Sequence, residues 1–486
     1  MYIDMILRSK AIYNSVELEP FDGYVAVEGN RISEVGRGDI PSALIGENTD
    51  VRDCGDRLVM AGFHDSHTHL IMAGLFNTYV NLLSATSEEE AVRMVKESAE
   101  TMEDKDGWIL GFCWYHVFWE NKRLPTKASL DAVFPDRPVC LINAEAHGAW
   151  VNTRAMEIAG ITRETPDPFG GEIARDENGE PEGFLYESAT GLVTKYAFDF
   201  TPEQEEEIIG NYLDSAKAYG ITSVTDVQPY FHGEMGNLEV YADMEARGKL
   251  TARLHVATDL LGDLDRAERL REQYRSDKLR VDLLKQFLDG VCTTHTALVL
   301  EDYADAPGSQ GISLNDTEAI RNAVPEAHRR GFSIKLHSCG DRSARLGLDY
   351  FENAIELYGR NDCRHAIEHC EIVAASDRGR FGELGVYPSV QPEHIALTQT
   401  FAETPYRVVL GEERAATTWP YRDLLESAGE MGIGSDCPVV DNNPFLEIYR
   451  GITRVHNDGE PAGGWNPTQK LTLAEVLRGY TYGGAY

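Results

Sequence analysis

The chain has 486 residues, 42% of them hydrophobic, which is enough for a large globular domain with an accessory domain. Its 80 acidic residues outnumber the 45 basic ones and give a net charge of −35, which argues against nucleic acid or an anionic membrane as a partner. No apolar run is long enough to span a bilayer and the first residues do not resemble a signal peptide, so a cytoplasmic location is expected.

Residues 1–57 predict a small β domain, because short strand-like segments alternate with turns such as "EGNR". From residue 58 onward, apolar strand-like segments alternate with helical stretches such as residues 317–331. This alternation predicts an α/β fold of the (β/α)8 TIM-barrel class. The eight predicted barrel strands lie at residues 58–63, 221–227, 253–260, 281–290, 332–341, 364–372, 385–394 and 431–440.

The first two predicted barrel strands are separated by about 150 residues, far more than one crossover helix needs. We therefore expect a barrel over residues 58–486 with a subdomain at about 75–215 inserted after its first strand. Within that insertion, residues 137–152 predict a strand and residues 170–187 predict a hairpin.

Five side chains of the kinds that bind metal fall at the ends of predicted barrel strands. In "AGFHDSHTHL", His67 and His69 are two residues apart and share one face of a strand. His337, His369 and Asp436 lie at the C-terminal ends of the fifth, sixth and eighth strands. Because these ends converge in such a barrel, the sequence predicts a metal centre at its mouth. Imidazole and carboxylate ligands suit zinc.

Lys285 is the sixth candidate ligand, and it has two interpretations. It lies in the apolar fourth strand, where burial would lower its pKa. A neutral amine can react with carbon dioxide to give a carbamate, which could bridge two metals. Alternatively, Lys285 forms a buried ion pair with an acid such as Asp289.

The ordered motifs "DSHTHL", "LLKQFLDG", "KLHSCGDRSA", "AIEHC" and "GIGSDCPV" resemble the amidohydrolase superfamily, and within it the amidohydrolase-3 subfamily that includes N-substituted formamide deformylases. The resemblance implies a small β-sandwich beside the barrel, with residues 1–57 as its N-terminal part. This sequence ends at "LRGYTYGGAY", before the C-terminal part of such a sandwich. The N-terminal sheet is therefore expected to keep exposed edges.

The resemblance also implies one or two divalent metal ions, usually zinc. His67, His69 and Asp436 would bind the first ion, His337 and His369 the second, and carbamylated Lys285 would bridge them. The ions would activate a hydroxide, and Asp436 would act as the catalytic proton carrier.

The predicted activity is metal-dependent hydrolysis of an amide or another non-peptide C–N bond in a small molecule. A lyase or isomerase using the same metal centre remains an alternative, as does a non-catalytic metal-binding regulatory protein. The expected substrate-binding residues are His147, Gln391 and His394, and an apolar wall of Trp and Phe residues from 108 to 119 could border them. Association into a homo-oligomer stays open.

Overall fold

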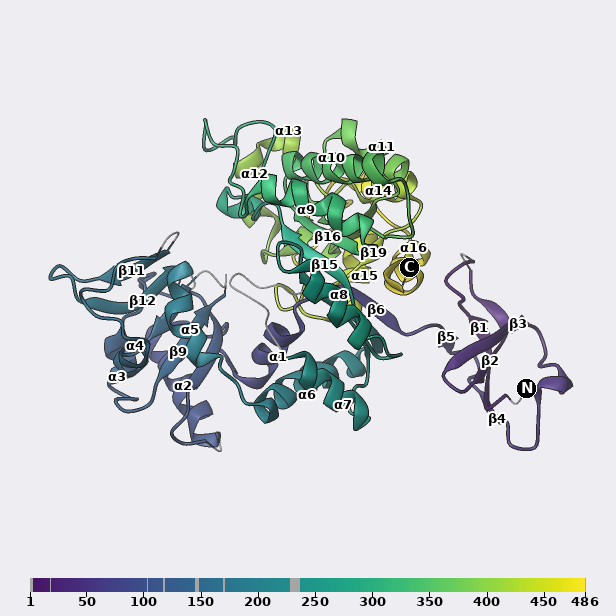
Figure 1. Cartoon of the computed structure of the whole chain (residues 1–486), viewed down its shortest axis with the longest axis horizontal. Coiled ribbons are helices and arrows are strands. Elements are labelled where there is room, and N and C mark those ends of the chain that lie inside the picture. The colour runs from purple at the N-terminus through teal and green to yellow at the C-terminus, as the bar shows by residue number, and fades with distance from the viewer. Residues whose placement is uncertain are drawn as a thin grey trace. The chain divides into compact units, whose positions relative to one another are not determined.

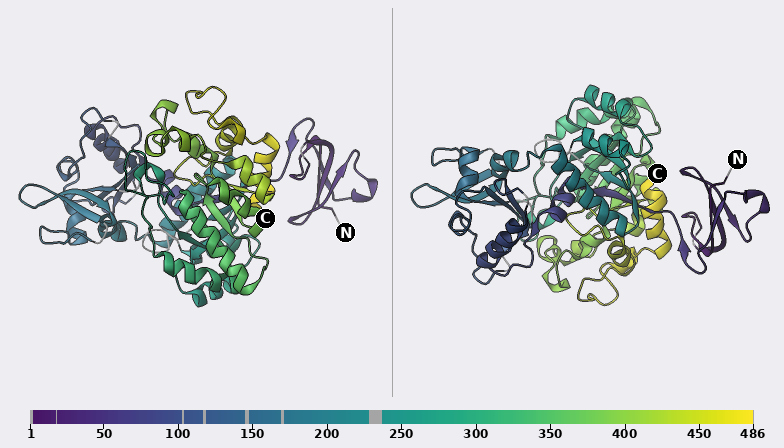
Figure 2. Two further views of the ribbon diagram at one scale, coloured as in Figure 1. Left: turned by 90° about the horizontal axis from the view of Figure 1, so that it is seen from above. Right: turned by 90° about the horizontal axis from the view of Figure 1, so that it is seen from below.

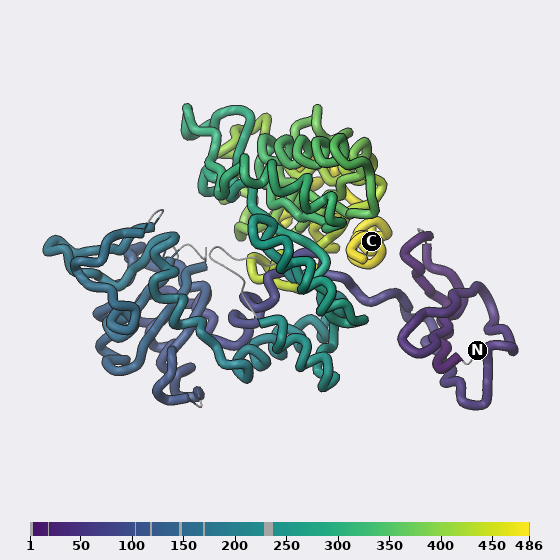
Figure 3. The backbone as a smooth tube through the Cα atoms, in the orientation of Figure 1, coloured from purple at the N-terminus to yellow at the C-terminus, as the bar shows by residue number. Residues whose placement is uncertain are grey.

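The computed structural model describes residues 3–17, 19–102, 104–116, 119–144, 148–168, 171–227 and 237–485. The chain divides into two compact units, which can be followed along the backbone in Figure 3. The first unit comprises Met1–His69, Ser215–Tyr230 and Leu250–Tyr486, and the second comprises Leu70–Asp214 and Phe231–Lys249. None of the helices in the described residues combines the length and apolarity that a membrane span requires.

The first unit contains an eight-stranded parallel sheet that curves into a nearly closed barrel (Figure 1). An isolated parallel bridge between Thr68 and Cys437 links the first strand to the segment after the last one. The predicted α/β barrel is therefore confirmed. Its strands, in their order around the barrel, are β6 (Phe63–Thr68), β13 (Ile221–Asp226), β14 (Arg253–Asp259), β15 (Leu279–Phe287), β16 (Ser333–Ser338), β17 (Ala366–His369), β18 (Tyr387–Val390) and β19 (Gly432–Ile433).

Strand β19 is much shorter than the strand predicted at residues 431–440, and the first barrel strand differs most from its predicted position. The strand was expected at residues 58–63, but β6 begins at Phe63 and contains the polar run "HDSHT". Every residue of β6 is buried, because the barrel interior covers one face and other elements cover the opposite face. Leu58 and Val59 instead form β5 (Leu58–Val59), which pairs with β1 (Met5–Ile12) in a separate sheet.

Helices pack around the outside of the barrel, and Figure 2 shows them from two further sides. Helix α10 illustrates why they do so, because Ala344, Leu348 and Phe351 recur at helical spacing and are all buried. Four of these helices lie in a row in which each contacts the next, and they are α9 (Thr317–Arg329), α10 (Asp341–Tyr358), α11 (Ala375–Leu384) and α14 (Tyr421–Ala428) (Figure 1). The others are α8 (Leu264–Gln273), α12 (Tyr406–Leu410), α13 (Glu412–Ala415), α15 (Pro444–Thr453) and α16 (Leu473–Arg478).

The N-terminal strands form one five-stranded sheet. Its members are β1, β2 (Phe21–Glu28), β3 (Arg31–Arg37), β4 (Asp50–Asp53) and β5. Strands β2 and β3 form an antiparallel hairpin, and Gly29 adopts a positive φ of 60° in its turn. Ile6, Tyr24 and Ala26 are buried in this sheet, whereas Ile32 on β3 is 61% exposed.

The second unit is built on a six-stranded sheet with its own core. Its strands, in sheet order, are β11 (Gly171–Arg175), β12 (Pro181–Glu187), β10 (Gly148–Val151), β9 (Val139–Asn143), β8 (Ile109–Trp114) and β7 (Val80–Asn81). The single strand expected at residues 137–152 is thus two antiparallel strands, β9 and β10. The helices are α1 (Leu70–Thr78), α2 (Glu88–Thr101), α3 (Lys127–Asp131), α4 (Thr153–Ala159), α5 (Gly191–Ala197) and α7 (Leu238–Ala246), and α6 (Pro202–Ala218) spans the boundary between the units.

Two of the tryptophans of this unit belong to its core rather than to the apolar substrate wall that was considered from the sequence. Trp114 and Trp119 are at most 1% exposed and pack with Trp150 and Phe184 in the core. Their large apolar area stabilises the fold when it is buried together. Phe118 lies outside the described residues.

Candidate metal centre

The predicted ligands come together at the C-terminal end of the barrel. Lys285 is in β15, His337 is in β16, His369 ends β17, and Asp436 follows β19 by three residues. These four side chains and His67 of β6 are all buried. His69, which directly follows β6, is more accessible.

Asp436 lies at the centre of two groups whose spacing could hold a metal ion. In the first group, the Nε2 atoms of His67 and His69 lie 3.2 and 3.3 Å from Oδ1 of Asp436. In the second group, His369 Nδ1 and His394 Nε2 lie 3.8 and 3.7 Å from Oδ2 of the same carboxylate. One carboxylate therefore faces four imidazole rings.

His337 lies beside the second group, and its ring centroid is 4.3 Å from that of His369. Its Nε2 atom lies 3.3 Å from the carbonyl oxygen of Gly290. His394, which is predicted to bind substrate, lies against Asp436, on the opposite carboxylate oxygen from His67. His337 and His394 are thus both positioned next to His369.

Two of these residues adopt an uncommon backbone conformation. His369 and Asp436 have positive φ values of 70° and 57°. Left-handed conformations cost energy for residues other than glycine, and they cluster at functional sites. The turn at His369 breaks the alternation of β17, so that both Glu368 and His369 reach His67.

Glu368 and Lys335 belong to the site but were not identified from the sequence. Glu368 accepts a hydrogen bond from Nδ1 of His67 and pairs with Lys335, whose Nζ is 2.7 Å from Oε1. Burial opposes the charge of Glu368, but Lys335 and His67 outweigh it and hold the pKa of this carboxyl well below its usual value. The bond to Glu368 directs the other ring nitrogen of His67 toward Asp436.

Asp65 fixes the loop that carries Asp436. Its carboxylate accepts hydrogen bonds from the backbone N–H and the hydroxyl of Ser435, at 2.9 and 2.6 Å. The loop also approaches β6 so closely that a Cβ atom at Gly434 would lie 2.4 Å from the backbone nitrogen of His67. Only glycine permits this approach, which positions Asp436 against His67.

Lys285 is fully buried, and its Nζ makes no hydrogen bond or ion pair with any described residue. Burial lowers its pKa to about 8. The ion pair with Asp289 that was considered from the sequence is absent from the described contacts. The Asp289 carboxylate instead accepts hydrogen bonds from the backbone of Leu298, Cys339 and Gly340 and from the Ser343 hydroxyl.

The buried polar atoms of the site fit a metal ion. Buried nitrogen and oxygen atoms almost always have hydrogen-bond partners. Here several have none among the described residues, and these atoms are His67 Nε2, both ring nitrogens of His369, His394 Nε2, Asp436 Oδ1, Lys285 Nζ and both amide atoms of Gln391. Imidazole nitrogens and carboxylate oxygens are the ligands that zinc and related divalent ions take, so a bound ion would satisfy the histidine and aspartate atoms of this set.

The other two expected substrate residues are Gln391 and His147. Gln391 follows β18 directly and is 1% exposed, and the 3.3 Å hydrogen bond from the hydroxyl of Tyr421 reaches only its backbone carbonyl. Its side-chain amide is thus left without a partner in the described part of the chain. His147 lies outside the described residues.

Comparison with known proteins identifies relatives over the whole chain. The model of the Amidohydrolase family matches residues 50–486. The Arabidopsis thaliana protein LONG AFTER FAR-RED 3 is 30% identical, over 99% of this chain and 83% of its own length. The N-substituted formamide deformylase of Arthrobacter pascens is 25% identical, over 95% of this chain and 85% of its own. The structure of a metal-dependent hydrolase from Pyrococcus horikoshii superposes with a TM-score of 0.82, at 23% identity, over 99% of this chain and 92% of that one.

Proposed function

Because the chain belongs to the amidohydrolase family, we propose that it is a metal-dependent hydrolase that cleaves an amide or another C–N bond of a small molecule. The observation that carries this proposal is the ring of unpartnered nitrogen and oxygen atoms around Asp436. The name of the relative from Arthrobacter pascens, an N-substituted formamide deformylase, supports C–N bond cleavage.

In this proposal His67, His69 and Asp436 would hold the first metal ion, for which zinc is the proposed identity. His337 and His369 would hold the second, and Lys285 as a carbamate would be a ligand to both. The lowered pKa of Lys285 supports the bridge, because only a neutral amine reacts with carbon dioxide. His394 is the competing second ligand, since it lies as close to Asp436 as His369 does.

Bound metal ions would lower the pKa of a water molecule and polarise the substrate carbonyl. Asp436 would take the proton of the attacking water at a carboxylate oxygen and deliver it to the leaving nitrogen. Glu368 would keep Nε2 of His67 free of a proton, because its hydrogen bond with Nδ1 selects the tautomer that carries the proton there. The amide of Gln391 would bind a polar group of the substrate.

A substrate screen tests this function. Wild-type protein loaded with zinc is incubated with N-formyl, N-acyl and cyclic amides, and release of the free amine is measured. We expect turnover of at least one class, and loss of that turnover in the Asp436→Asn variant. Equal turnover by wild type and variant, or no amine release from any class by metal-loaded protein, would reject the proposal.

A further inference from the structure

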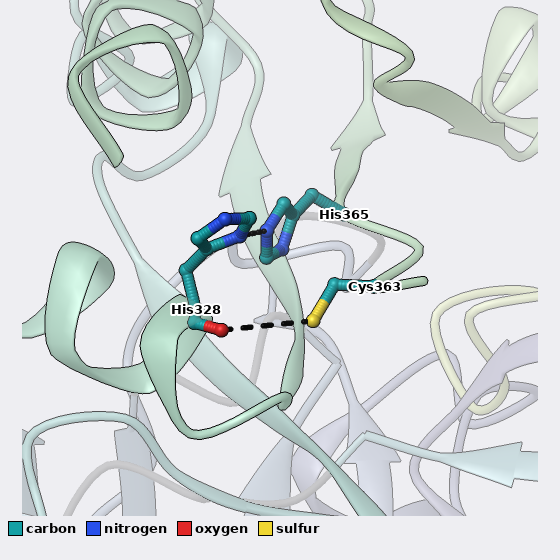
Figure 4. Close-up of side chains that lie close together, drawn as sticks. All are labelled: His328, Cys363 and His365. Carbon is teal, nitrogen blue, oxygen red and sulfur yellow. Dashed lines mark hydrogen bonds between the residues drawn. The ribbon is translucent and has the colours of Figure 1, made fainter. Parts of the chain in front are cut away.

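A second cluster of residues of the kinds that bind metal lies far from the candidate centre. It consists of His328 near the end of α9, His365 immediately before β17, and Cys363 in the segment between α10 and β17 (Figure 4). One ligand atom from each residue lies within 4.8 Å of the other two. His365 and His369 stand at opposite ends of β17, roughly 13 Å apart along the strand, so the cluster is at the N-terminal end of the barrel.

The two imidazoles are already oriented toward a shared point. His328 Nδ1 and His365 Nε2 are 2.8 Å apart, and His328 Nε2 donates to the carbonyl oxygen of Gly359 at 2.8 Å. Metal-binding histidines commonly donate their second ring N–H to a backbone carbonyl in this way, which leaves the other nitrogen as the ligand. His328 is thus held with Nδ1 as its ligand atom.

His365 can supply Nε2 without losing another hydrogen bond. Its Nδ1 atom is buried and has no partner among the described residues, so no second contact commits the ring to one tautomer. The ring is held in place by stacking on Phe351, at a centroid distance of 4.5 Å and an interplanar angle of 9°. The proton shared between the two rings is therefore the group that a cation would replace.

Cys363 supplies the third ligand and the route for entry. Its Sγ lies 4.0 Å from the carbonyl oxygen of His328, which is a weak contact for a thiol. The side chain is partly exposed, whereas His328 and His365 are buried, so solvent reaches the cluster from the cysteine side. A water molecule can then serve as the fourth ligand of a tetrahedrally coordinated ion.

We propose that His328, Cys363 and His365 form a separate site for a thiophilic divalent cation such as zinc. In tetrahedral zinc geometry, neighbouring ligand atoms are about 3.4 to 3.6 Å apart, so the two nitrogens open by about half an ångström and the sulfur closes in. The ion joins the end of α9 to the segment before β17 and stabilises the N-terminal end of the barrel. The proposal does not depend on the activity of the candidate centre.

Thiol reactivity in the wild-type protein provides the first test. The chain is alkylated with iodoacetamide with and without zinc, and each cysteine is followed by peptide mass spectrometry. Cys54 is the internal control, because it is partly exposed like Cys363. Among the described residues, it belongs to none of the clusters that could hold a metal ion. We expect zinc to slow alkylation of Cys363 at least about tenfold and to leave Cys54 unchanged. Equal rates at Cys363 with and without zinc would overturn the proposal.

Cobalt substitution provides the second test. A cobalt ion bound by a thiolate gives a charge-transfer band in the near ultraviolet. We expect this band in the wild type and in Cys54→Ser. Cys363→Ser should lose the band and should bind about one equivalent of cobalt less than the wild type. Circular dichroism checks that the serine variant is folded. A Cys363→Ser spectrum and cobalt content equal to those of the wild type would overturn the proposal.

Discussion

The Nε2 atom of His67 lies 3.2 Å from Oδ1 of Asp436, yet neither atom has a hydrogen-bond partner among the described residues. Such a buried pair is costly unless a third group satisfies both atoms. In the proposed mechanism a metal ion does so, and Asp436 also carries the proton. This arrangement leads to separate predictions for Asp436 and for the residue that orients His67.

Replacing Asp436 by Asn should lower kcat at least about a hundredfold, because the amide cannot accept the proton of water. The protein should remain folded and keep part of its metal, since Asn has nearly the same shape. Steady-state kinetics, circular dichroism and metal analysis of the variant check this prediction. Near-normal turnover would remove Asp436 from the mechanism.

Replacing Glu368 by Gln should weaken metal binding about 10- to 100-fold, because His67 loses the carboxylate that orients its ring. The affinity is measured by zinc titration against a competing chelator. Glu383→Gln on α11 is the matched control, since Glu383 is exposed on a helix that packs on the outside of the barrel. Equal zinc affinity in both variants would show that Glu368 does not orient His67.

Lys285 distinguishes a bridging carbamate from a purely structural lysine. Lys285→Ala should lose the second metal and most activity while staying folded, and acetate or formate should partly restore both by occupying the vacant bridge. If Lys285 only supports the fold, the variant should instead lose about 3 to 5 kcal/mol of stability and keep two metals while folded. Melting temperature and metal content measured on the same sample separate these outcomes.

Lys285 should also make the stability of the metal-free protein depend on pH. Its pKa is lowered by burial from 10.5 to about 8, so between these values the unfolded chain binds a proton that the folded chain does not. Lys285 should therefore contribute roughly 3 kcal/mol of stability as the pH increases from about 8 to 10.5, against the opposite contribution of buried thiols such as that of Cys140, whose pKa burial raises. Urea unfolding of the metal-free, carbon-dioxide-free wild type and Lys285→Met variant measures this contribution as the difference between their pH slopes. Equal slopes would show that Lys285 makes no such contribution.

Most of the barrel could be predicted from the sequence, because buried parallel strands are short apolar runs between helical stretches. The first strand was misplaced for the same reason, since its polar ligands hide its strand character. In the second unit, residues 137–152 are predicted as one strand, although the polar stretch "NAEAHG" at residues 143–148 separates the apolar parts that form β9 and β10.

The site was predictable where ligands lie at or just after the C-terminal end of a strand, as at His67 and Asp436. Lys335 also carried a signal, because it precedes His337 by two residues and thus shares its face of β16. Glu368 carried none, since its inward position depends on the positive φ of His369 beside it. The cluster of His328, Cys363 and His365 was equally hidden, because packing of α9 against the segment before β17 brings it together.

The most direct test of the account is turnover of an amide substrate as metal is returned to chelator-stripped protein. Each point of the titration gives bound metal and the rate of amine release in the same sample. The account predicts no activity in the stripped protein. In the Cys363→Ser variant, which lacks the separate site, the rate of amine release should rise with bound metal and level off at about two equivalents of metal per chain. Full activity in the stripped protein, or bound metal with no amine release from any amide, would contradict it.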